Sequence, residues 1–189
     1  MSSHVDAPDW STIPVPSDDG AAGHLPGLKV PSIPLPATDG TTVDLSALAG
    51  LVVVYAYPRT GLPGVENPPG WDVIPGARGC TPQSCAFRDR FAELKALGVG
   101  HVFGLSTQAT AYQAEAAARL HLPFPILSDE HLTLARALRL STFETSGMTL
   151  LKLLTLVIRD GVIEYVFYPV FPPDRHAGDV VAWLSAGAR

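Results

Sequence analysis

The chain has 189 residues and a formal net charge of −5 at pH 7. Apolar residues make up 47% and charged residues 16%, which describes a globular chain with a sizeable core and excludes a disordered one. The negative charge gives no reason to expect a nucleic-acid or membrane partner, and the longest apolar runs are far too short to cross a bilayer.

The N-terminal segment, residues 1–26, contains Pro8, Pro14, Pro16 and Pro26. Proline disrupts regular structure, so we expect an extended arm here and one domain over residues 27–189. No basic stretch followed by an apolar run marks a signal peptide, which predicts a cytoplasmic location.

Two strand signals follow the arm. Residues 30–36 and 42–45 flank a turn sequence around Asp39-Gly40, which predicts a β-hairpin. Residues 51–57 form an almost continuous apolar, β-branched run, which is typical of a central strand buried on both faces.

A long loop rich in glycine and proline is predicted over residues 58–79. Connections of this length inside a compact domain are usually functional or disordered. Because this one leads directly to a cysteine, we expect it to shape a reactive pocket. The alternative is a tolerated surface insertion.

Both cysteines lie in the short stretch 79–85. Thr81 is a good N-cap residue and Pro82 suits the first helical position, so Cys80 is expected just ahead of a helix N-terminus. Free backbone N–H groups and the helix dipole stabilise an anion there, and Arg78 and Arg88 are close in sequence. This setting predicts a lowered pKa for the Cys80 thiol and a reactive thiolate.

Cys85 falls on the predicted apolar stripe of the same helix. Helical Cα atoms five residues apart are roughly 8–9 Å apart, whereas a disulfide needs about 4.4–6.8 Å. The two cysteines can therefore bridge only if the first turn unwinds, which indicates a cycling bond rather than a structural one. Two unrelated buried thiols are the alternative.

The rest of the chain alternates strands and helices. The predicted elements are a strand at 101–106, a helix at 108–121 with Ala111, Ala114, Ala118 and Leu122 inward, a short strand at 126–128, a helix capped by Asp129 and ending at Leu138, a hairpin of 153–159 with 162–169 around Asp160-Gly161, and a last helix from Asp174 or His176 with Val180, Val181 and Leu184 inward. This order predicts an α/β fold of the thioredoxin-like kind, with a mixed central sheet flanked by helices.

With these elements in place, the sequence resembles the peroxiredoxins, and most closely the peroxiredoxin Q (bacterioferritin-comigratory-protein) branch of the thioredoxin-like superfamily. The resemblance covers nearly all of residues 27–184. It is carried by the segments 35–45, 53–58, 79–89, 122–129 and 155–161, and the spacing of Cys80 and Cys85 matches the branch that keeps both redox cysteines on one helix.

The resemblance implies a function. Cys80 would be the peroxidatic cysteine, whose thiolate attacks a peroxide O–O bond and becomes a sulfenic acid. Cys85 would resolve it to a Cys80–Cys85 disulfide, which a thioredoxin-type dithiol reduces by exchange. The implied substrates are hydrogen peroxide and small organic hydroperoxides. A monomer without a cofactor is expected, and the six histidines show no zinc-like pairing with the cysteines.

At two positions where the family usually has residues that contact the peroxide or support the thiolate, this chain has different residues. The family usually has a Thr or Ser three residues before the reactive cysteine, where this chain has Ala77, and its Pro58 lies at the far end of the loop. Thr60 is a candidate to fold back as the missing hydroxyl, although a turn residue is the simpler interpretation. Lys152 aligns with the family's usual arginine, or is a charge extending from a strand end. Pro58, Thr60 and Lys152 are thus the predicted substrate-binding residues, with Arg78 as a substitute cation.

Two other functions stay open from the sequence. One is a slow thiol–disulfide oxidoreductase or peroxide sensor, in which the altered loop impairs peroxide activation. The other is a non-catalytic binding module of thioredoxin fold, in which the loop 58–79 is the recognition surface.

Overall fold

The computed structural model describes residues 8–187. Its centre is a five-stranded sheet in the order β5-β4-β3-β8-β9. The strands are β3 (Leu51–Ala56), β4 (Val99–Ser106), β5 (Ile126–Ser128), β8 (Leu154–Arg159) and β9 (Val162–Phe167). β3, β4 and β5 run parallel, whereas β8 pairs antiparallel with both β3 and β9. The predicted mixed sheet is confirmed.

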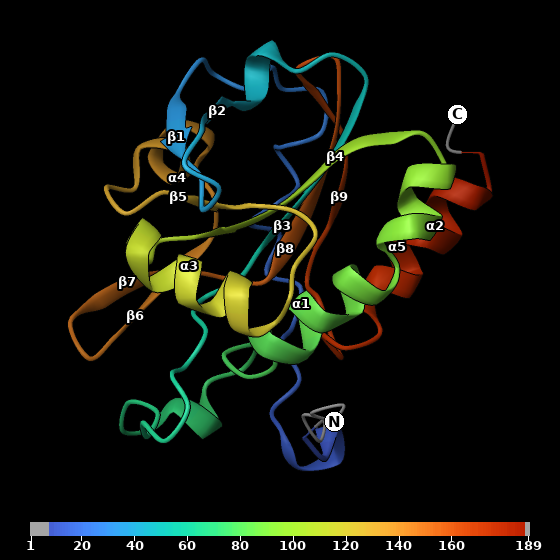
Figure 1. Ribbon diagram of the computed structural model, residues 1–189. Helices are drawn as coiled ribbons and strands as arrows, with labels where there is room; N and C mark the ends of the chain where they lie inside the picture. The colour runs from blue at the N-terminus through green and yellow to red at the C-terminus, as the bar shows by residue number, and fades with distance from the viewer. Residues whose placement is uncertain (1–7, 188–189) are drawn as a thin grey trace.

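Helices cover both faces of this sheet (Figure 1). The helices are α1 (Cys80–Asp89), α2 (Phe91–Ala96), α3 (Thr110–Arg119), α4 (Thr133–Leu138) and α5 (His176–Ser185). One face packs against α1, α2 and α5, and the other against α4 and a small hairpin of β1 (Pro34–Pro36) and β2 (Thr42–Asp44). None of the described helices is long and apolar enough to cross a membrane.

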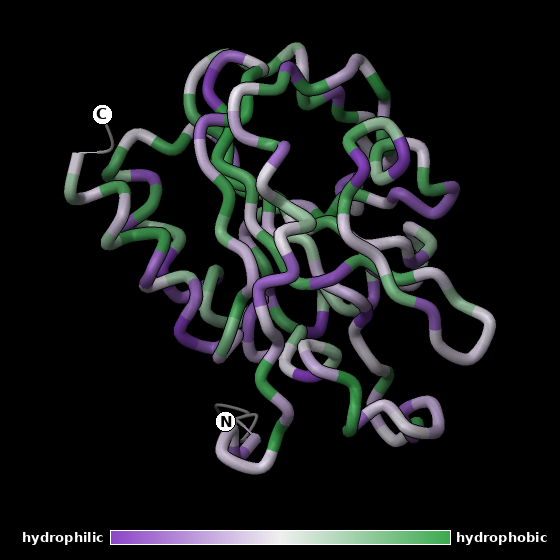
Figure 2. The backbone as a smooth tube through the Cα atoms, turned by 180° about the vertical axis from the view of Figure 1, so that it is seen from behind, coloured by the Kyte–Doolittle hydropathy of each residue, from purple (hydrophilic) through white to green (hydrophobic). Residues whose placement is uncertain are grey.

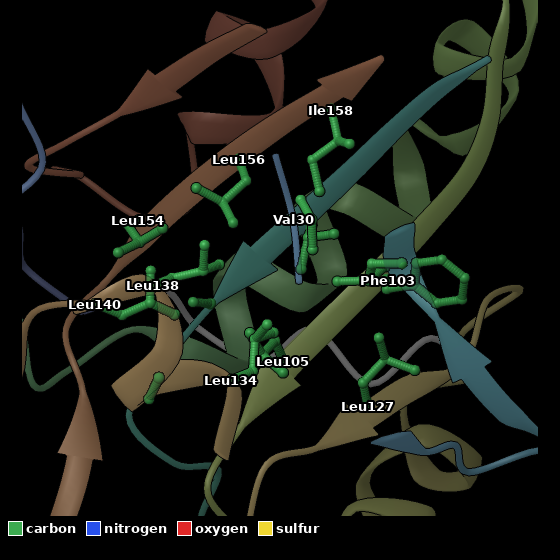
Figure 3. Close-up of a cluster of buried hydrophobic side chains, with 14 of the residues drawn as sticks. Val30, Phe103, Leu105, Leu127, Leu134, Leu138, Leu140, Leu154, Leu156 and Ile158 are labelled. Atoms are coloured by element: carbon green, nitrogen blue, oxygen red, sulfur yellow. The ribbon is translucent and has the colours of Figure 1, made fainter. Parts of the chain in front are cut away.

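Strand β3 is buried along its whole length, as predicted. Alternate side chains of a strand point to opposite faces, so Val52 and Val54 join the core under α4 while Val53 and Tyr55 join the core under α1 and α5. Figure 3 shows the first of these cores, with Leu134 and Leu138 of α4 facing the sheet. The hydropathy colouring of Figure 2 shows the same concentration of apolar residues along the central strands.

The hairpin around Asp160-Gly161 is confirmed, and both turn residues have positive φ. A second hairpin, β6 (Thr142–Thr145) with β7 (Met148–Leu151), was not predicted. Its strands are short and partly exposed, so they lack the long apolar run that marks a buried strand.

The N-terminal arm packs on the domain over its described part, residues 8–26. It holds one short 3₁₀ turn, Trp10–Thr12, and is otherwise irregular. Ile13 and Leu25 are buried, and Asp19 forms an ion pair with Lys152 at 2.9 Å. The division between arm and domain at residue 26 stays a prediction, and residues 1–7 of the arm lie outside the described part.

The predicted inward face of α3 is wrong at Ala111 and Ala118, which are exposed. Ala114 is half-buried, and Leu122, just after the helix, packs partly buried against the core. The fully buried residues of α3 are Gln113 and Ala116. The Gln113 amide donates to Ser106 Oγ at 2.8 Å and to the Leu127 carbonyl at 2.9 Å, which ties the helix to the ends of β4 and β5. A polar residue thus faces inward, and an apolar pattern cannot reveal it.

The predictions for the cap of α4 and for the buried side of α5 agree better with the structure. The Asp129 carboxylate accepts the N–H groups of Leu134 and Ala135 at 3.0 and 2.8 Å, so it caps α4 as expected. In α5, Val180 is buried, whereas Val181 and Leu184 are only partly buried. The buried surface of α5 begins with His176.

We predict that stability falls in acid because His176 is buried. Its ring contacts Phe87 and Phe167 edge-on, its Nε2 lies 2.7 Å from Thr155 Oγ1, and burial lowers its pKa from 6.5 to about 4. The unfolded chain therefore binds an extra proton between these pH values, so the free energy of unfolding decreases as the pH falls, at most about 1.4 kcal/mol per pH unit from this group.

The measurement is urea unfolding at several pH values for the wild type and His176→Gln, which keeps a hydrogen-bonding group beside Thr155. The variant should show a shallower loss of stability between pH 6 and 4. Parallel pH curves for the two proteins would mean that His176 does not titrate on unfolding.

Candidate functional site

Cys80 is the first residue of α1. The helix starts earlier than predicted, because Gly79 is the N-cap, with φ 100°, and the Gln83 N–H donates to the Gly79 carbonyl at 2.9 Å. The expectation that Thr81 caps the helix is therefore wrong. A left-handed glycine lets the chain turn into the helix two residues sooner, and no side chain caps the free N–H groups of the first turn.

Cys80 lines a small cavity of about 200 Å³. Both ends of the loop 58–79 contribute to it, through Arg59 on one side and Trp71 and Ala77 on the other. The loop therefore shapes the pocket around the cysteine, as predicted. In Figure 1 the loop and the first described residues of the N-terminal arm lie together below α1, and Pro8 of the arm also lines the cavity.

The Cys80 thiol is buried, with 3% of the residue exposed. Burial raises its pKa to about 12, although the Arg59 backbone N–H and guanidinium both favour the thiolate. The predicted lowering of this pKa is thus wrong for this conformation, because removal of water from the sulfur outweighs the nearby positive charge. The thiol is protonated at neutral pH, with Sγ 3.7 Å from the Ala77 carbonyl oxygen.

The two arginines that were expected to assist Cys80 are paired elsewhere. Arg78 lines the cavity but lies 3.5 Å from a carboxylate oxygen of Asp72. Arg88 binds Asp89 at 2.8 Å and the Leu120 carbonyl at 2.9 Å.

Cys85 lies on the same helix and is a free, half-buried thiol. The buried residues of α1 are Cys80, Gln83, Ser84 and Phe87. The predicted apolar stripe is buried at Phe87 and Leu94, and Cys85 lies at its half-buried edge. Burial raises the Cys85 pKa, and the Arg88 guanidinium partly opposes this. Both cysteines are helical here, and helical Cα atoms five residues apart are too far from each other for a disulfide. A bond between the two cysteines therefore requires the first turn to unwind.

Gln83 was missed by the sequence analysis. It is fully buried one turn after Cys80, and neither its amide oxygen nor its amide nitrogen has a hydrogen-bond partner among the described residues. Unpaired buried polar atoms cost free energy, so this amide has unused capacity to bind a polar molecule. Its sequence signal was a glutamine among the apolar residues of the helix face.

The three predicted substrate-binding residues do not line the Cys80 cavity. Pro58 is buried, and Thr60 donates its N–H to Gln108 Oε1 at 3.0 Å and its hydroxyl to the same oxygen at 3.4 Å. Lys152 lines a different cavity of about 310 Å³ and is held by Asp19. The structure instead brings Arg59 to Cys80. Its only signal in the sequence was its position directly after Pro58.

No group of three or more His, Cys, Asp or Glu side chains within residues 8–187 is arranged to hold a metal ion. In the cavity, the Cys80 thiol lies with the Arg59 guanidinium, and Gln83 and Cys85 lie further along the same helix.

Comparison with protein families matches residues 25–182 to the redoxin family. A chloroplastic peroxiredoxin Q of Oryza sativa subsp. japonica is 30% identical over 161 residues, which is 85% of this chain and 66% of the rice protein. The chain thus spans just under two thirds of that relative's length.

Solved structures agree with this family. Peroxidoxin BcpB from Mycobacterium tuberculosis is 28% identical with a TM-score of 0.69, over 87% of this chain and 99% of that one. A Xanthomonas campestris peroxiredoxin Q structure is 25% identical with a TM-score of 0.66, over 86% and 98% of the two chains. These likenesses confirm the thioredoxin-like fold.

We predict that Gly79→Ala is strongly destabilising. A Cβ at Gly79 would lie 2.7 Å from Trp10 Cη2 and 2.7 Å from Pro173 Cγ, in addition to the strain of a positive φ. The backbone strain alone costs about 1–2 kcal/mol, and the overlap with two rings adds to it.

Gly64→Ala is the matched control, because Gly64 has a φ of 75° in the same loop but open space around its Cβ position. In denaturant unfolding, Gly79→Ala should lose more stability than Gly64→Ala by about 1 kcal/mol or more. Equal losses would show that Trp10 and Pro173 are not packed against the start of α1.

Proposed function

Because the chain belongs to the redoxin family and is similar to its peroxiredoxin Q members, we propose that it is a thiol-dependent peroxidase acting on hydrogen peroxide and small organic hydroperoxides. The observation that carries this proposal is the position of Cys80. It is the first residue of a helix, in a small cavity, next to an N–H group and a guanidinium, with a second thiol on the same helix.

The first step oxidises Cys80. Its sulfur attacks one peroxide oxygen, the O–O bond breaks, and the other oxygen leaves as water or an alcohol with the proton that the thiol gave up. Cys80 becomes a sulfenic acid. A cavity of about 200 Å³ has room for a molecule as small as hydrogen peroxide, and the helix N-terminus stabilises the negative charge that passes from sulfur to oxygen.

The second step joins the two cysteines. The Cys85 sulfur attacks the Cys80 sulfenic sulfur, an S–S bond forms, and water leaves with the Cys85 proton. The first turn of α1 must open for this bond, and Gly79, directly before it, is a residue type that accepts a wide range of backbone angles. A thioredoxin-type dithiol then reduces the bond by exchange, and the dithiol itself becomes a disulfide.

The burial of Cys80 supports the alternative of a slow thiol enzyme or sensor. A pKa of about 12 leaves little thiolate at neutral pH, as expected for a slow thiol–disulfide oxidoreductase or a peroxide sensor. The rate of Cys80 oxidation separates this alternative from the peroxidase. A monomeric enzyme and a cytoplasmic location stay predictions from the sequence.

We predict that Cys80→Ser abolishes peroxide turnover with a dithiol reductant, because serine cannot form the sulfenic acid. Activity should fall to the uncatalysed background, while circular dichroism and thermal unfolding stay close to those of the wild type. Dithiol-dependent turnover in this variant would contradict the assignment of Cys80. A Cys80→Ser protein that keeps a wild-type binding partner would favour the binding module.

We also predict that Cys85→Ser stops the cycle after one step. One equivalent of hydrogen peroxide should oxidise Cys80 at the wild-type rate, and the sulfenic acid should then persist long enough to be trapped by a dimedone-type probe and seen by mass spectrometry. A probe adduct equally strong in the wild type would show that Cys85 is not the resolving thiol. Slow oxidation of Cys80 in the variant would contradict the prediction that Cys85 acts only in the second step.

A further inference from the structure

We propose that Arg59 supplies the positive charge that binds the peroxide beside Cys80, and that Lys152 does not. This inference rests on the proposed peroxidase function. It assigns the substrate-binding cation to a residue at the start of the loop 58–79, at a different place in the fold from the strand position with which Lys152 aligns.

Lys152 is committed to other groups. Its Nζ lies 2.9 Å from Asp19 Oδ2, and the Tyr168 hydroxyl donates to the other oxygen of the same carboxylate at 2.8 Å. These three residues line the 310 Å³ cavity between the N-terminal arm and the domain, and Cys80 does not. The charge of Lys152 is thus neutralised by the arm and faces a separate space.

Arg59 lies between two cavities: it lines the Cys80 cavity together with Trp71, and it also lines a neighbouring cavity that contains Tyr112 and Glu130. Among residues 8–187 it has no carboxylate within ion-pair distance, so its charge is free to act on an incoming group. The guanidinium carbon lies 5.7 Å from the centre of the Trp71 ring, and Nη2 donates to the Tyr112 hydroxyl at 3.4 Å. A half-buried arginine held by a ring and a phenol, with no anion of its own, is suited to bind one.

The loop 58–79 provides the aromatic ring over which the Arg59 guanidinium lies. Trp71 comes from the short 3₁₀ turn Trp71–Val73, is 4% exposed, and packs with Ala77, Phe143 and Leu150 in a small apolar cluster. The loop therefore holds a rigid ring under the guanidinium on one side of the cavity and places Ala77 next to Cys80 on the other. This gives the insertion a role at the site beyond simply enclosing the cysteine.

The charge of Arg59 reaches the Cys80 sulfur. Both the Arg59 guanidinium and its backbone N–H favour the thiolate and oppose the effect of burial on the pKa of this thiol. During attack, negative charge moves from sulfur to the leaving oxygen, and a planar guanidinium can donate N–H groups to both. The thiol proton ends on the leaving oxygen.

The test uses Cys85→Ser as the background, so that Cys80 is the only thiol. Arg59→Met, Arg59→Lys and Lys152→Met are compared in two assays. The first is the ratio of the Cys80 alkylation rates by anionic iodoacetate and by neutral iodoacetamide, because a positive charge in the cavity speeds the anionic reagent relative to the neutral one. The second is the rate of Cys80 oxidation by hydrogen peroxide.

Arg59→Met should lower the iodoacetate-to-iodoacetamide ratio about tenfold or more and slow peroxide oxidation by at least as much. Arg59→Lys should lower the ratio less than Arg59→Met does, because lysine keeps the positive charge but lacks the planar pair of N–H donors of arginine. Lys152→Met should leave both values within about threefold of the background protein. A loss of fold would slow both alkylating reagents together, so the ratio separates charge from structure.

An unchanged alkylation ratio in Arg59→Met would overturn the proposal. A larger loss in Lys152→Met than in Arg59→Met would also overturn it, and would return the role to Lys152. The peroxidase function fails separately. If the background protein is oxidised no faster than a simple thiol, the enzyme assignment is lost, while the alkylation ratio still reports whether the Arg59 charge acts on Cys80.

Discussion

The structure depends on the complete burial of β3. Because both faces of this strand are covered, it must lie in the middle of the sheet, and its carboxyl end delivers Tyr57, Pro58 and Arg59 to one edge of the domain. The helix that carries Cys80 begins at the same edge, after the loop returns. The site is therefore an end-of-strand site, as expected for a sheet with parallel strands at its centre. The loop 58–79 joins these two parts of the site, because it begins beside Arg59 at the end of β3 and ends beside Cys80 at the start of α1.

Two opposing effects set the reactivity of Cys80. Burial raises the pKa of its thiol, whereas the guanidinium and N–H of Arg59 favour the thiolate, and in the structure burial dominates. In the proposed reaction, a peroxide molecule in the cavity replaces some of the missing water around the sulfur with its own hydrogen-bonding groups. The Arg59 guanidinium has no carboxylate partner among residues 8–187 and lines the cavity, so it is available to such a molecule. The unpaired amide of Gln83 is fully buried one turn further along α1 and does not line this cavity.

Much of the fold could be predicted from the sequence, because the central strands and the Asp160-Gly161 hairpin carry strong local signals. The site could be predicted only in part. Both cysteines could be found from their spacing, but the start of α1 could not, since it depends on a left-handed Gly79 packed against Trp10 and Pro173. Alignment indicated Lys152, yet its partner Asp19 lies far away in the sequence, in an arm whose packing the local pattern does not reveal. Arg59 was missed because its proximity to Cys80 depends on the path of the whole loop.

The most direct test of the account is a timed oxidation of the fully reduced protein. One equivalent of hydrogen peroxide is added, the mixture is quenched within seconds with an alkylating agent under denaturing conditions, and the intact mass is measured. A peroxidase that works through Cys80 and Cys85 should be converted to a species that has lost two hydrogens and carries no alkyl group, which is the Cys80–Cys85 disulfide. Protein recovered mainly with both cysteines alkylated would contradict this prediction, and would show that Cys80 is an ordinary slow thiol in a peroxiredoxin-like fold.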